Sequence, residues 1–510
     1  MPRLPVDGRR RAERSRLHDR GPRRPARRHA ARSRRVEDRR VRAAECVVVG
    51  GGPAGLAAAR TAARHGARVV LVDENAELGG QYYRQVPAQF RMREAPVLGK
   101  ETTEGRALID EIRSLGVELR LDATVWGVFD QRIVTVATRD ATERIEAQTL
   151  ILAPGAYDRP VPFPGWTLPG VMTAGGAQNL MKGYRVLPGR RVLVAGSGPL
   201  LLVVARYLLH GGAQVVAVAE ASPLRGLWRY AHRMLPHLNL VQRAYAYRRE
   251  LQDAGVPLLS GHVIRRALGK TEVEHAVIGP CDDAWRPRAG SEPSYDVDAV
   301  VVGYGFLSSL ELSRLAGCEH RYEPAVGGWV PVRDRNLETT VPGVFVAGDG
   351  AGVAGSAVAV AEGHWAGLGV AHRLGRLTGR AYSSEASRAR GRLRHLAGFR
   401  RVMDELYRFG PGIYTLADDR VTLCRCEEIT VGEALAAIRD GASHVNEVKA
   451  WTRAGMGRCQ GRMCGPALAH LVARETGRSV ADAGCFTPRP PAKPVPIEAL
   501  ANEVGPREGV

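Results

Sequence analysis

Four cysteines near the C-terminal end of the chain form two closely spaced pairs. One residue separates Cys424 from Cys426, four residues separate Cys459 from Cys464, and 32 residues lie between the two pairs. Four thiolates can hold either a tetrahedral zinc ion or a [2Fe–2S] cluster. Zinc sites usually carry C-x2-C pairs at both ends, so the C-x-C spacing favours iron–sulfur over zinc or an empty site. We therefore predict a [2Fe–2S] cluster with these four cysteines as its ligands.

The segment around these cysteines predicts short helices that can bring the two pairs together. Helices are expected at residues 432–440 and 444–453, and Gly465 and Pro466 begin a third. The N-terminus of a helix carries a partial positive charge, which helps to offset the charge of the thiolates. The remaining cysteines stand alone in the sequence and are not expected to be ligands: Cys46, Cys281, Cys318 and Cys485.

A glycine motif in the first tenth of the chain can bind the pyrophosphate of a dinucleotide. The sequence ECVVVGGGPAGLAAARTAARHGARVVLVDEN reads as strand, turn, helix and strand. Gly50, Gly52 and Gly55 have the G-x-G-x-x-G spacing, which permits a tight turn, close approach of backbone to phosphate and close packing of helix on strand. Asp73 lies where a carboxylate accepts a hydrogen bond from a ribose hydroxyl, and Glu74 is the second candidate for this role.

Two later segments favour FAD in this first site. The sequence LGGQ places Gly80 and Gln81 in a loop where backbone could lie against the phosphates and ring of a flavin. The sequence VPGVFVAGDGAG reads as a buried strand that carries Gly348 and Asp349 to the start of a helix. These features resemble the two-dinucleotide-binding flavoproteins, whose relatives include thioredoxin reductase and glutathione reductase. The resemblance implies that Asp349 holds the ribityl chain of FAD and that the helix after it favours the anionic reduced ring.

A second strand, turn, helix and strand motif is incomplete. Gly196 and Gly198 open it, but Leu201 stands where the third glycine belongs and Ala219 stands in place of the acid, with Glu220 after it. A side chain at the third position pushes the helix from the strand or crowds a pyrophosphate. We therefore favour a retained scaffold or another nucleotide over NAD(P), with Gly196, Gly198 and Glu220 as the candidate contacts. Because neither motif region contains a cysteine pair, disulfide reduction is excluded.

The distribution of charge argues against a nucleic-acid-binding protein. The formal net charge is +20, but residues 1–44 alone contribute 17 Arg against 5 acids, which leaves +8 for residues 45–510. This Arg-rich arm lacks apolar periodicity and is expected to be disordered. A dispensable extension or an artefact of the assumed translation start is favoured over a nucleic-acid or membrane-surface arm and over a targeting segment. No window has the roughly 20 apolar residues of a membrane-spanning helix, and no export leader is evident. We therefore expect a cytoplasmic protein without an integral span, for which peripheral membrane association stays open.

The order of these features is similar to that of one family of flavoprotein subunits. The chain resembles the alpha subunits of opine oxidase, hydrogen cyanide synthase and the multi-subunit proline and hydroxyproline dehydrogenases. The stretches VVGYGFLSSLELSRLAGC, GGWVPVRD and KAWTRAGMGRCQGRMCG carry this resemblance. The cysteine segment itself resembles the [2Fe–2S] domain of bacterioferritin-associated ferredoxin. The resemblance implies bound FAD, a partner beta subunit similar to D-amino-acid oxidase and, as a further candidate partner, a small ferredoxin-like subunit.

The fold class expected from these motifs is α/β. It comprises two Rossmann-like three-layer dinucleotide-binding domains and a small helical [2Fe–2S]-binding domain at the C-terminal end. The expected parts are the disordered arm (1–44), the first part of the FAD-binding domain (45–165), the degenerate dinucleotide-binding domain (166–290), the second part of the FAD-binding domain (291–380), a helical linker (381–418), the cluster domain (419–480) and a Pro-rich tail (481–510).

Three functions are compatible with these motifs. The first is an FAD-dependent oxidoreductase subunit that passes electrons from the oxidation of an opine, glycine, proline or hydroxyproline-like substrate through FAD and the cluster to an acceptor. The second is a self-contained NAD(P)H-dependent flavin reductase, against which Leu201 and Ala219 argue. The third is a non-enzymatic scaffold with structural zinc, against which the intact flavin motif argues. No acid–base or nucleophile constellation identifies catalytic residues, because the histidines considered stand alone: His65, His210, His320, His364 and His444.

Overall fold

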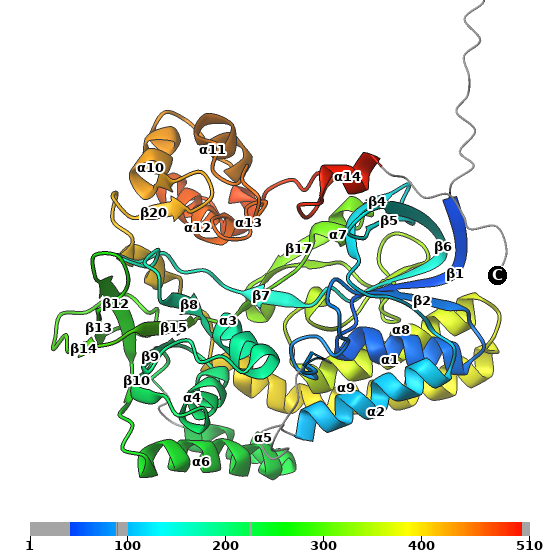
Figure 1. Cartoon of the computed structure of the whole chain (residues 1–510), viewed down its shortest axis with the longest axis horizontal. Coiled ribbons are helices and arrows are strands. Elements are labelled where there is room, and N and C mark those ends of the chain that lie inside the picture. The colour runs from blue at the N-terminus through cyan, green and yellow to red at the C-terminus, as the bar shows by residue number, and fades with distance from the viewer. Residues whose placement is uncertain (1–40, 88, 90–99, 224–226, 502–510) are drawn as a thin grey trace, which may run out of the picture. The chain divides into compact units, whose positions relative to one another are not determined.

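The structure, a computed structural model, describes residues 41–87, 89, 100–223 and 227–501. It contains one mixed, largely parallel sheet and one parallel sheet, both flanked by helices, and a group of helices near the C-terminal end (Figure 1). The predicted α/β fold class is confirmed. The Arg-rich arm lies outside the described residues up to position 40, and the first strand begins at Val41, four residues before the predicted boundary. Among the described helices, none is long and apolar enough to cross a membrane.

The first sheet is formed by the most apolar runs of the N-terminal third and by one late strand. Parallel strands follow the order β3, β2, β1, β6, with β19 also parallel to β6, and β5 and β4 extend the other side as an antiparallel hairpin. The strands are β1 (Val41–Val49), β2 (Val69–Val72), β3 (Glu118–Arg120), β4 (Thr124–Phe129), β5 (Ile133–Ala137), β6 (Thr142–Leu152) and β19 (Val344–Val346). The carboxyl ends of β1, β2, β6 and β19 meet at one edge, where ligands bind in sheets of this kind.

Two helices that are rich in small residues cover one face of this sheet. Helix α1 (Pro53–Arg64) packs closely on α8 (Ser356–Arg373), while α2 (Lys100–Ser114) packs beside α1 (Figure 1). The close approach requires glycine, because a side chain at Gly363 would collide with the carbonyl oxygen of Ala54. The contact fixes the N-terminal end of α1 against the part of the chain that follows β19.

The second sheet is parallel throughout and carries the second glycine motif. Its order is β11, β10, β9, β15, β8, and a separate antiparallel sheet β12–β13–β14 lies beside it. The strands are β8 (Val171–Thr173), β9 (Arg191–Gly196), β10 (Gln214–Glu220), β11 (Leu258–Ser260), β12 (His262–Leu268), β13 (His275–Pro280), β14 (Ser294–Asp296) and β15 (Ala299–Gly303). The helices of this part are α3 (Ala174–Asn179), the π-helix η1 (Leu180–Tyr184), α4 (Leu200–His210), η2 (Leu227–Tyr230), α5 (Ala231–Met234), η3 (Leu235–His237) and α6 (Leu238–Asp253).

Short pairs of strands connect the two sheets. Strand β7 (Ala156–Asp158) leaves the first sheet and pairs antiparallel with β16 (Phe306–Ser308), which returns from the second. The hairpin β17 (His320–Glu323) and β18 (Gly328–Pro331) follows, with α7 (Glu311–Leu315), η4 (Pro324–Val326) and η5 (Gly348–Ala351) nearby in the chain.

Helices dominate the chain after residue 379. They are α9 (Gly379–Leu406), η6 (Pro411–Leu416), α10 (Val431–Arg439), α11 (Val445–Thr452), α12 (Gly465–Thr476), α13 (Val480–Ala483) and α14 (Ile497–Ala501), with the short hairpin β20 (Thr422–Cys424) and β21 (Ile429–Thr430) before α10. The helices predicted at 432–440 and 444–453 are confirmed as α10 and α11. Helix α10 begins and ends one residue earlier than predicted, and α11 is one residue shorter at each end. Thr430 and Glu433 form a capping box that starts α10.

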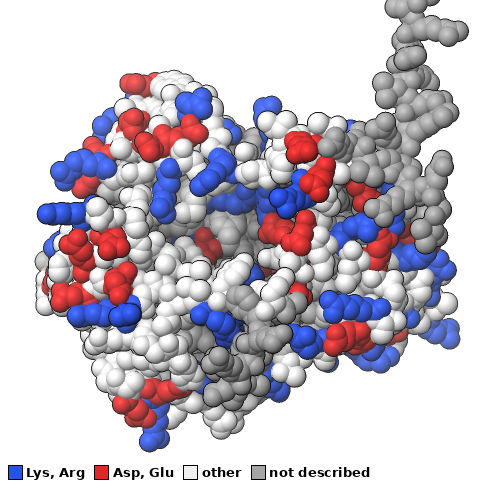
Figure 2. Space-filling view, viewed as in Figure 1, with Lys and Arg blue, Asp and Glu red and all other residues white. Residues whose placement is uncertain are grey.

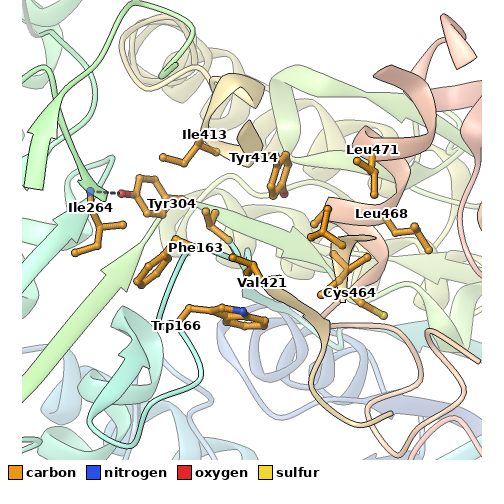
Figure 3. Packing of buried hydrophobic residues seen from close by; sticks show 14 of the residues in the cluster. Phe163, Trp166, Ile264, Tyr304, Ile413, Tyr414, Val421, Cys464, Leu468 and Leu471 are labelled. Atoms are coloured by element: carbon orange, nitrogen blue, oxygen red, sulfur yellow. Dashed lines mark hydrogen bonds between the residues drawn. The ribbon is translucent and has the colours of Figure 1, made fainter. Parts of the chain in front are cut away.

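Helices α10, α11 and α12, which lie next to the cysteines in the chain, share a buried core with the second sheet. Trp166, Tyr304 and Leu468 lie in one cluster of buried side chains that also contains Cys464 (Figure 3). Two hydrogen bonds reinforce it, from the Trp166 indole to the carbonyl of Thr422 (2.7 Å) and from the Ile264 N–H to the Tyr304 hydroxyl (3.2 Å). The helices beside the cysteines are therefore anchored by apolar packing to the second sheet.

Candidate cofactor sites

Small residues hold the turn between β1 and α1 tightly. Gly50 has a φ of 102°, and a side chain there would collide with the carbonyl oxygen of Ala153 at the end of β6. A side chain at Gly55 would collide with the carbonyl oxygen of Gly50 itself. Gly52 precedes α1 without any side-chain cap, so the first N–H groups of the helix have no side-chain acceptor. The turn thus presents backbone donors and the positive end of a helix, which together favour an anion.

Asp73 lies directly against this turn. One of its carboxylate oxygens accepts a hydrogen bond from the N–H of Gly51 (2.5 Å), and the other accepts from the N–H and the side-chain amide of Asn75 (2.8 Å each). The residue is 8% exposed. Glu74, in contrast, points to the tail of the chain and forms an ion pair with Lys493. The geometry therefore favours Asp73 over Glu74 as the carboxylate that serves a nucleotide at this turn.

The glycine-rich loop after β2 also touches the turn. The N–H of Gly79 donates to the carbonyl oxygen of Gly51 (2.8 Å), and a side chain on Gly80 would lie 2.8 Å from the Cα of Gly52. Gln81 follows and is exposed. Because neither Gly52 nor Gly80 has a side chain, the two backbones approach one another closely beside the start of α1.

Gly348 and Asp349 reach the same helix from the other side. A side chain on Gly348 would lie 2.7 Å from the Cβ of Ala54 in the first turn of α1. The carboxylate of Asp349 accepts hydrogen bonds from the N–H groups of Ala354 (2.9 Å) and Gly355 (3.1 Å), which fixes the loop before α8. Burial raises the pKa of Asp349, while these two hydrogen bonds act in the opposite direction.

The residues predicted for the flavin site are therefore brought together around the N-terminus of α1. Gly52 and Gly80 lie on one side of it, and Gly348 lies on the other. A cradle of bare backbone beside unsatisfied helix N–H groups suits a pyrophosphate, so the residues present fit a dinucleotide cofactor. The individual role of each residue toward FAD stays a prediction.

The turn between β9 and α4 repeats this geometry with its own carboxylate. Gly196 has a φ of 156°, and a side chain there would collide with the carbonyl oxygen of Gly303. Glu220 accepts hydrogen bonds from the N–H groups of Gly198 (3.0 Å) and Ser222 (2.9 Å), and burial raises its pKa. The three candidate contacts of the second motif thus meet at one turn, and what this turn binds stays a prediction.

Leu201 occupies the third position of this motif without disrupting it. The residue lies in the first turn of α4, is 1% exposed and packs against the neighbouring strand β15. A Cβ added to Gly303 in β15 would lie only 3.2 Å from the Leu201 Cδ2. A glycine on the adjacent strand therefore provides the space that the leucine needs.

The four predicted metal ligands lie in the structure as two pairs of thiols. A side-chain hydrogen bond joins Cys424 to Cys464; it lowers the pKa of Cys424 to about 5 and raises the pKa of Cys464. The side chain of Cys426 contacts that of Cys459, whose pKa is raised by burial first and by this neighbour second. Within the described ranges, no group of three or more His, Cys, Asp or Glu side chains is arranged to hold a single metal ion. The four thiols thus form two contacting pairs, and Cys459 also acts electrostatically on Cys464.

Glycines and one aromatic side chain shape the loop that carries the second pair. A side chain on Gly457 would collide with Cys426, and a side chain on Gly461 would collide with the ring of Phe486. Phe486 belongs to the tail after α13 and also lies against Gly455. Cys464 immediately precedes α12, so the partial positive charge of that helix faces the thiols.

Sequence reasoning missed the tail as part of both sites. Lys493 pairs with Glu74 beside the first turn, and Phe486 covers the loop that carries Cys459. The N–H of Ala492 donates to the carbonyl oxygen of Trp126 in β4 (2.6 Å). These are single residues in a Pro-rich segment without periodicity, so no pattern in the sequence indicates their contacts.

Family models match most of the chain. Residues 44–364 match the model described as "Pyridine nucleotide-disulphide oxidoreductase", and residues 419–503 match the "Sarcosine oxidase A3 domain". The first match contains both glycine turns and Asp349, and the second contains the four paired cysteines.

Curated relatives align over nearly the whole chain. One subunit of the opine oxidase of Rhizobium meliloti (strain 1021) is 35% identical over 91% of this chain and 99% of its own length. Hydrogen cyanide synthase subunit HcnB of Pseudomonas aeruginosa is 33% identical over 89% of this chain and 98% of its own length. The fold is similar to that of L-proline dehydrogenase from P. horikoshii, with a TM-score of 0.65, 21% sequence identity, and coverage of 90% of this chain and 80% of that chain.

The family resemblance seen in the sequence is therefore confirmed, and FAD is the cofactor that the family of the first match implies. The chain belongs to the pyridine nucleotide-disulphide oxidoreductase family, among the flavin-dependent oxidoreductase subunits related to those of opine oxidase and hydrogen cyanide synthase.

Proposed function

We propose that this chain is the electron-relay subunit of an amine or amino-acid dehydrogenase or oxidase, with FAD at the first turn and a [2Fe–2S] cluster at the four paired cysteines. The proposed substrate class is that of opines, glycine, proline or hydroxyproline, as the resemblance found in the sequence implies; among these, opine oxidase is the name of a relative at 35% identity. When bound, a flavin exchanges electrons in pairs and the cluster exchanges them singly, so the subunit connects a two-electron oxidation to a one-electron acceptor.

The pairing of the cysteine thiols is the observation that carries this proposal. Each iron of a [2Fe–2S] cluster takes two protein ligands, whereas one zinc ion needs four ligands around a single point. Cys424 with Cys464 and Cys426 with Cys459 supply two ligands at each of two points.

The chain contributes binding, orientation and exclusion of water at both proposed sites. Cys424 and Cys464 are buried in the core that joins helices α10, α11 and α12 to the second sheet. This burial keeps solvent from one side of the proposed cluster. The start of α12 faces the thiolates and offsets their charge. At the flavin site, the uncapped start of α1 holds the pyrophosphate, and Asp73 and Asp349 orient the sugar portions.

We place substrate oxidation on a partner subunit. The relatives are named as subunits, and no acid–base or nucleophile constellation emerges from the sequence of this chain. A beta subunit similar to D-amino-acid oxidase fits this role, and a small ferredoxin-like subunit is a further candidate partner. The cytoplasm is the proposed compartment, since closely paired cysteines that do metal work belong to reducing surroundings.

The test is an absorption spectrum of the full-length protein purified without oxygen, with flavin, iron and zinc measured on the same sample. About two irons and one flavin per chain are expected. Cys464→Ser should lose most of the iron and keep the flavin, because the two sites are built from different residues. Cys485→Ser is the matched control, since this nearby cysteine lies in the tail outside both pairs, and it should keep both metal and flavin.

Each alternative function predicts a different result. Zinc in place of iron in the wild-type protein would overturn the cluster and support a scaffold role. Rapid bleaching of the flavin bands by added NADH would overturn the relay role and support a self-contained reductase. Leu201 and Ala219, where the second motif departs from the dinucleotide pattern, argue against the reductase.

A further inference from the structure

A cavity of about 140 Å³ lies between the cysteine-bearing loop and the strands that connect the two sheets. Ser308 and Glu311 line one wall, whereas Gln460 and Arg462, from the segment between the two cysteines of the C-x4-C pair, line the other. Tail residues, Phe486 among them, close a further side. In Figure 2, Lys and Arg side chains border the hollow that separates the C-terminal helices from the part around α7 on the visible face. The two predicted cofactor sites thus have this cavity as a neighbour.

The charge of the inner walls is positive. Arg159, Arg314 and Arg462 line the cavity, and Glu311 is the carboxylate among its lining residues. Glu311 is already paired with Arg462 at 2.9 Å. Within the described ranges, Arg159 and Arg314 form no ion pair with a carboxylate. His470, which also lines the cavity, adds no charge at neutral pH, because burial and the nearby Arg159 lower its pKa to about 4.

Three buried donors around this cavity lack an acceptor among the described residues. They are the Nε of Arg159, the Nε of Arg314 and the indole Nε1 of Trp329, and all three residues line the cavity. Arg159 is only 8% exposed, so its guanidinium cannot turn out to bulk water. Leaving a buried donor unsatisfied is costly, and a charged donor more so, which means that an acceptor is expected at this place.

Aromatic rings form much of the remaining wall. The rings of Tyr322 and Trp329 lie 5.7 Å apart in an edge-to-face arrangement, and the guanidinium of Arg314 lies 5.4 Å from the centre of the Trp329 ring. Phe486 and Tyr157 complete this apolar lining. Such walls favour a ligand with an apolar or planar body over a bare inorganic ion.

We propose that this cavity binds a small organic anion whose carboxylate or phosphate group is held by Arg159 and Arg314 and whose apolar body lies against Trp329 and Phe486. The cavity adjoins residues of both predicted sites. The hydroxyl of Ser308 donates to the backbone oxygen of Asp349 at 2.6 Å, and Gln460 directly follows Cys459. A ligand in the cavity would therefore lie beside Ser308, which holds the loop of Asp349, and beside Gln460, which follows Cys459.

The test is calorimetric titration of the full-length purified protein at low ionic strength with four probes. Benzoate and phenyl phosphate carry the anion and the ring, benzamide carries the ring alone, and inorganic phosphate carries the anion alone. We expect one molecule of benzoate or phenyl phosphate per chain, with benzamide and inorganic phosphate each bound roughly tenfold or more weakly. The tighter of the first two probes identifies the carboxylate or the phosphate as the natural group.

Three variants locate the binding. Arg314→Gln should weaken benzoate or phenyl phosphate by roughly tenfold or more, because it removes the charge-assisted donors. Trp329→Phe keeps the ring and loses the N–H, so a weakening of roughly threefold is expected. Arg478→Gln, at an exposed position outside the cavity, is the control and should bind as the wild type does. Unchanged flavin content and melting temperature show that each variant is folded.

The same variants also test for a natural ligand that stays bound to the protein through purification. Denaturation should then release about one small acid per chain from the wild type and from Arg478→Gln, but not from Arg314→Gln. The proposal is overturned if neither probe binds and no acid is released, if benzamide or inorganic phosphate binds as tightly as the organic anions, or if Arg314→Gln changes nothing. Because the readout is binding, it fails or succeeds independently of the proposed electron relay.

Discussion

The two glycine turns of this chain have the same frame but distribute their small residues differently. At the first turn, Asp73 accepts from the backbone of Gly51, and at the second, Glu220 accepts from the backbone of Gly198. Each carboxylate also accepts from the N–H two residues further along the chain. A buried carboxylate that ties its own turn is therefore a structural part of both motifs, whatever either turn binds.

The third motif position and the neighbouring strand exchange their roles between the two turns. At the first turn the helix has Gly55 and the adjacent strand end has Ala153, whereas at the second the helix has Leu201 and the adjacent strand end has Gly303. At the first turn the carbonyl oxygen of Gly50 excludes a side chain at Gly55, and at the second turn the bare Gly303 leaves room for the Leu201 side chain. The missing glycine of the second motif is thus compensated within its own sheet.

The incomplete motif raises two separate questions: whether the second turn can fold, and whether it can bind a dinucleotide. Leu201 does not prevent the second turn from folding, because Gly303 makes room for it. It still lies at the start of α4, close to the place where a pyrophosphate would meet the helix. The difference between the turns therefore concerns what they bind rather than whether they fold.

Among the substitutions that test this comparison, Gly55→Leu should cause the largest change in flavin content and stability. The substitution gives the first turn the residue of the second without the compensating glycine, and the new side chain would collide with the carbonyl oxygen of Gly50. We expect loss of nearly all bound flavin and a loss of more than about 3 kcal/mol in the free energy of unfolding. Flavin absorbance per chain and urea unfolding measure the two effects.

Gly391→Leu is the matched control for that substitution. Gly391 lies within α9, and an added side chain there meets nothing within 4 Å. Leucine is a better helix former, so a gain of about 0.5–1 kcal/mol is expected, with unchanged flavin content. If Gly55→Leu kept its flavin as the control does, the inference that the first turn requires glycine at position 55 would be wrong.

The sequence predicted more of these two turns than of their surroundings. Spacing alone placed Gly50 and Gly52 in the turn after the strand and Gly55 in the first turn of the helix, because Gly50 and Gly55 answer local steric demands. It could not show that Gly303, about 100 residues after Leu201, supplies the compensating space, since that contact depends on strand pairing across the sheet.

The cysteine region shows the same limit of sequence reasoning. The spacing of the four cysteines and the helices between them could be read locally, but the packing of Trp166 on the segment before Cys424 could not. The contact of Phe486 with the cysteine loop likewise joins separate segments. Arg159 and Arg314 carry no recognisable spacing, so the cavity between them becomes visible only when the chain is folded.

Gly303→Ala should have an intermediate effect. The new methyl group would lie 3.2 Å from the Leu201 Cδ2 and 2.9 Å from the Cβ of Ala174, which costs about 1–3 kcal/mol of unfolding free energy. Adding Leu201→Ala should recover part of this cost, with a coupling of about 0.5–3 kcal/mol in a double-mutant cycle measured by urea unfolding. Strict additivity of the two substitutions would contradict the exchange of small residues between helix and strand.

The smallest expected effect is a dependence on pH that belongs to the second turn. Burial raises the pKa of Glu220 above its ordinary value of 4.5, so the folded protein holds this proton at pH values where the unfolded chain has released it. Stability contributed by the group is complete below pH 4.5 and falls as the pH rises through the folded pKa, by at most about 1.4 kcal/mol per pH unit.

Glu220→Gln removes this titration. The stability difference, wild type minus variant, should therefore decrease between pH 5 and neutrality when the melting temperature is followed across the range. Glu433 is a control of opposite sign, because the N–H and hydroxyl of Thr430 lower its pKa below 4.5. Its contribution is already complete above pH 4.5, so Glu433→Gln should show a flat difference over the same interval. A flat difference for Glu220 as well would mean that its carboxylate is ionised at no cost at the second turn, as a bound cation or solvent would allow.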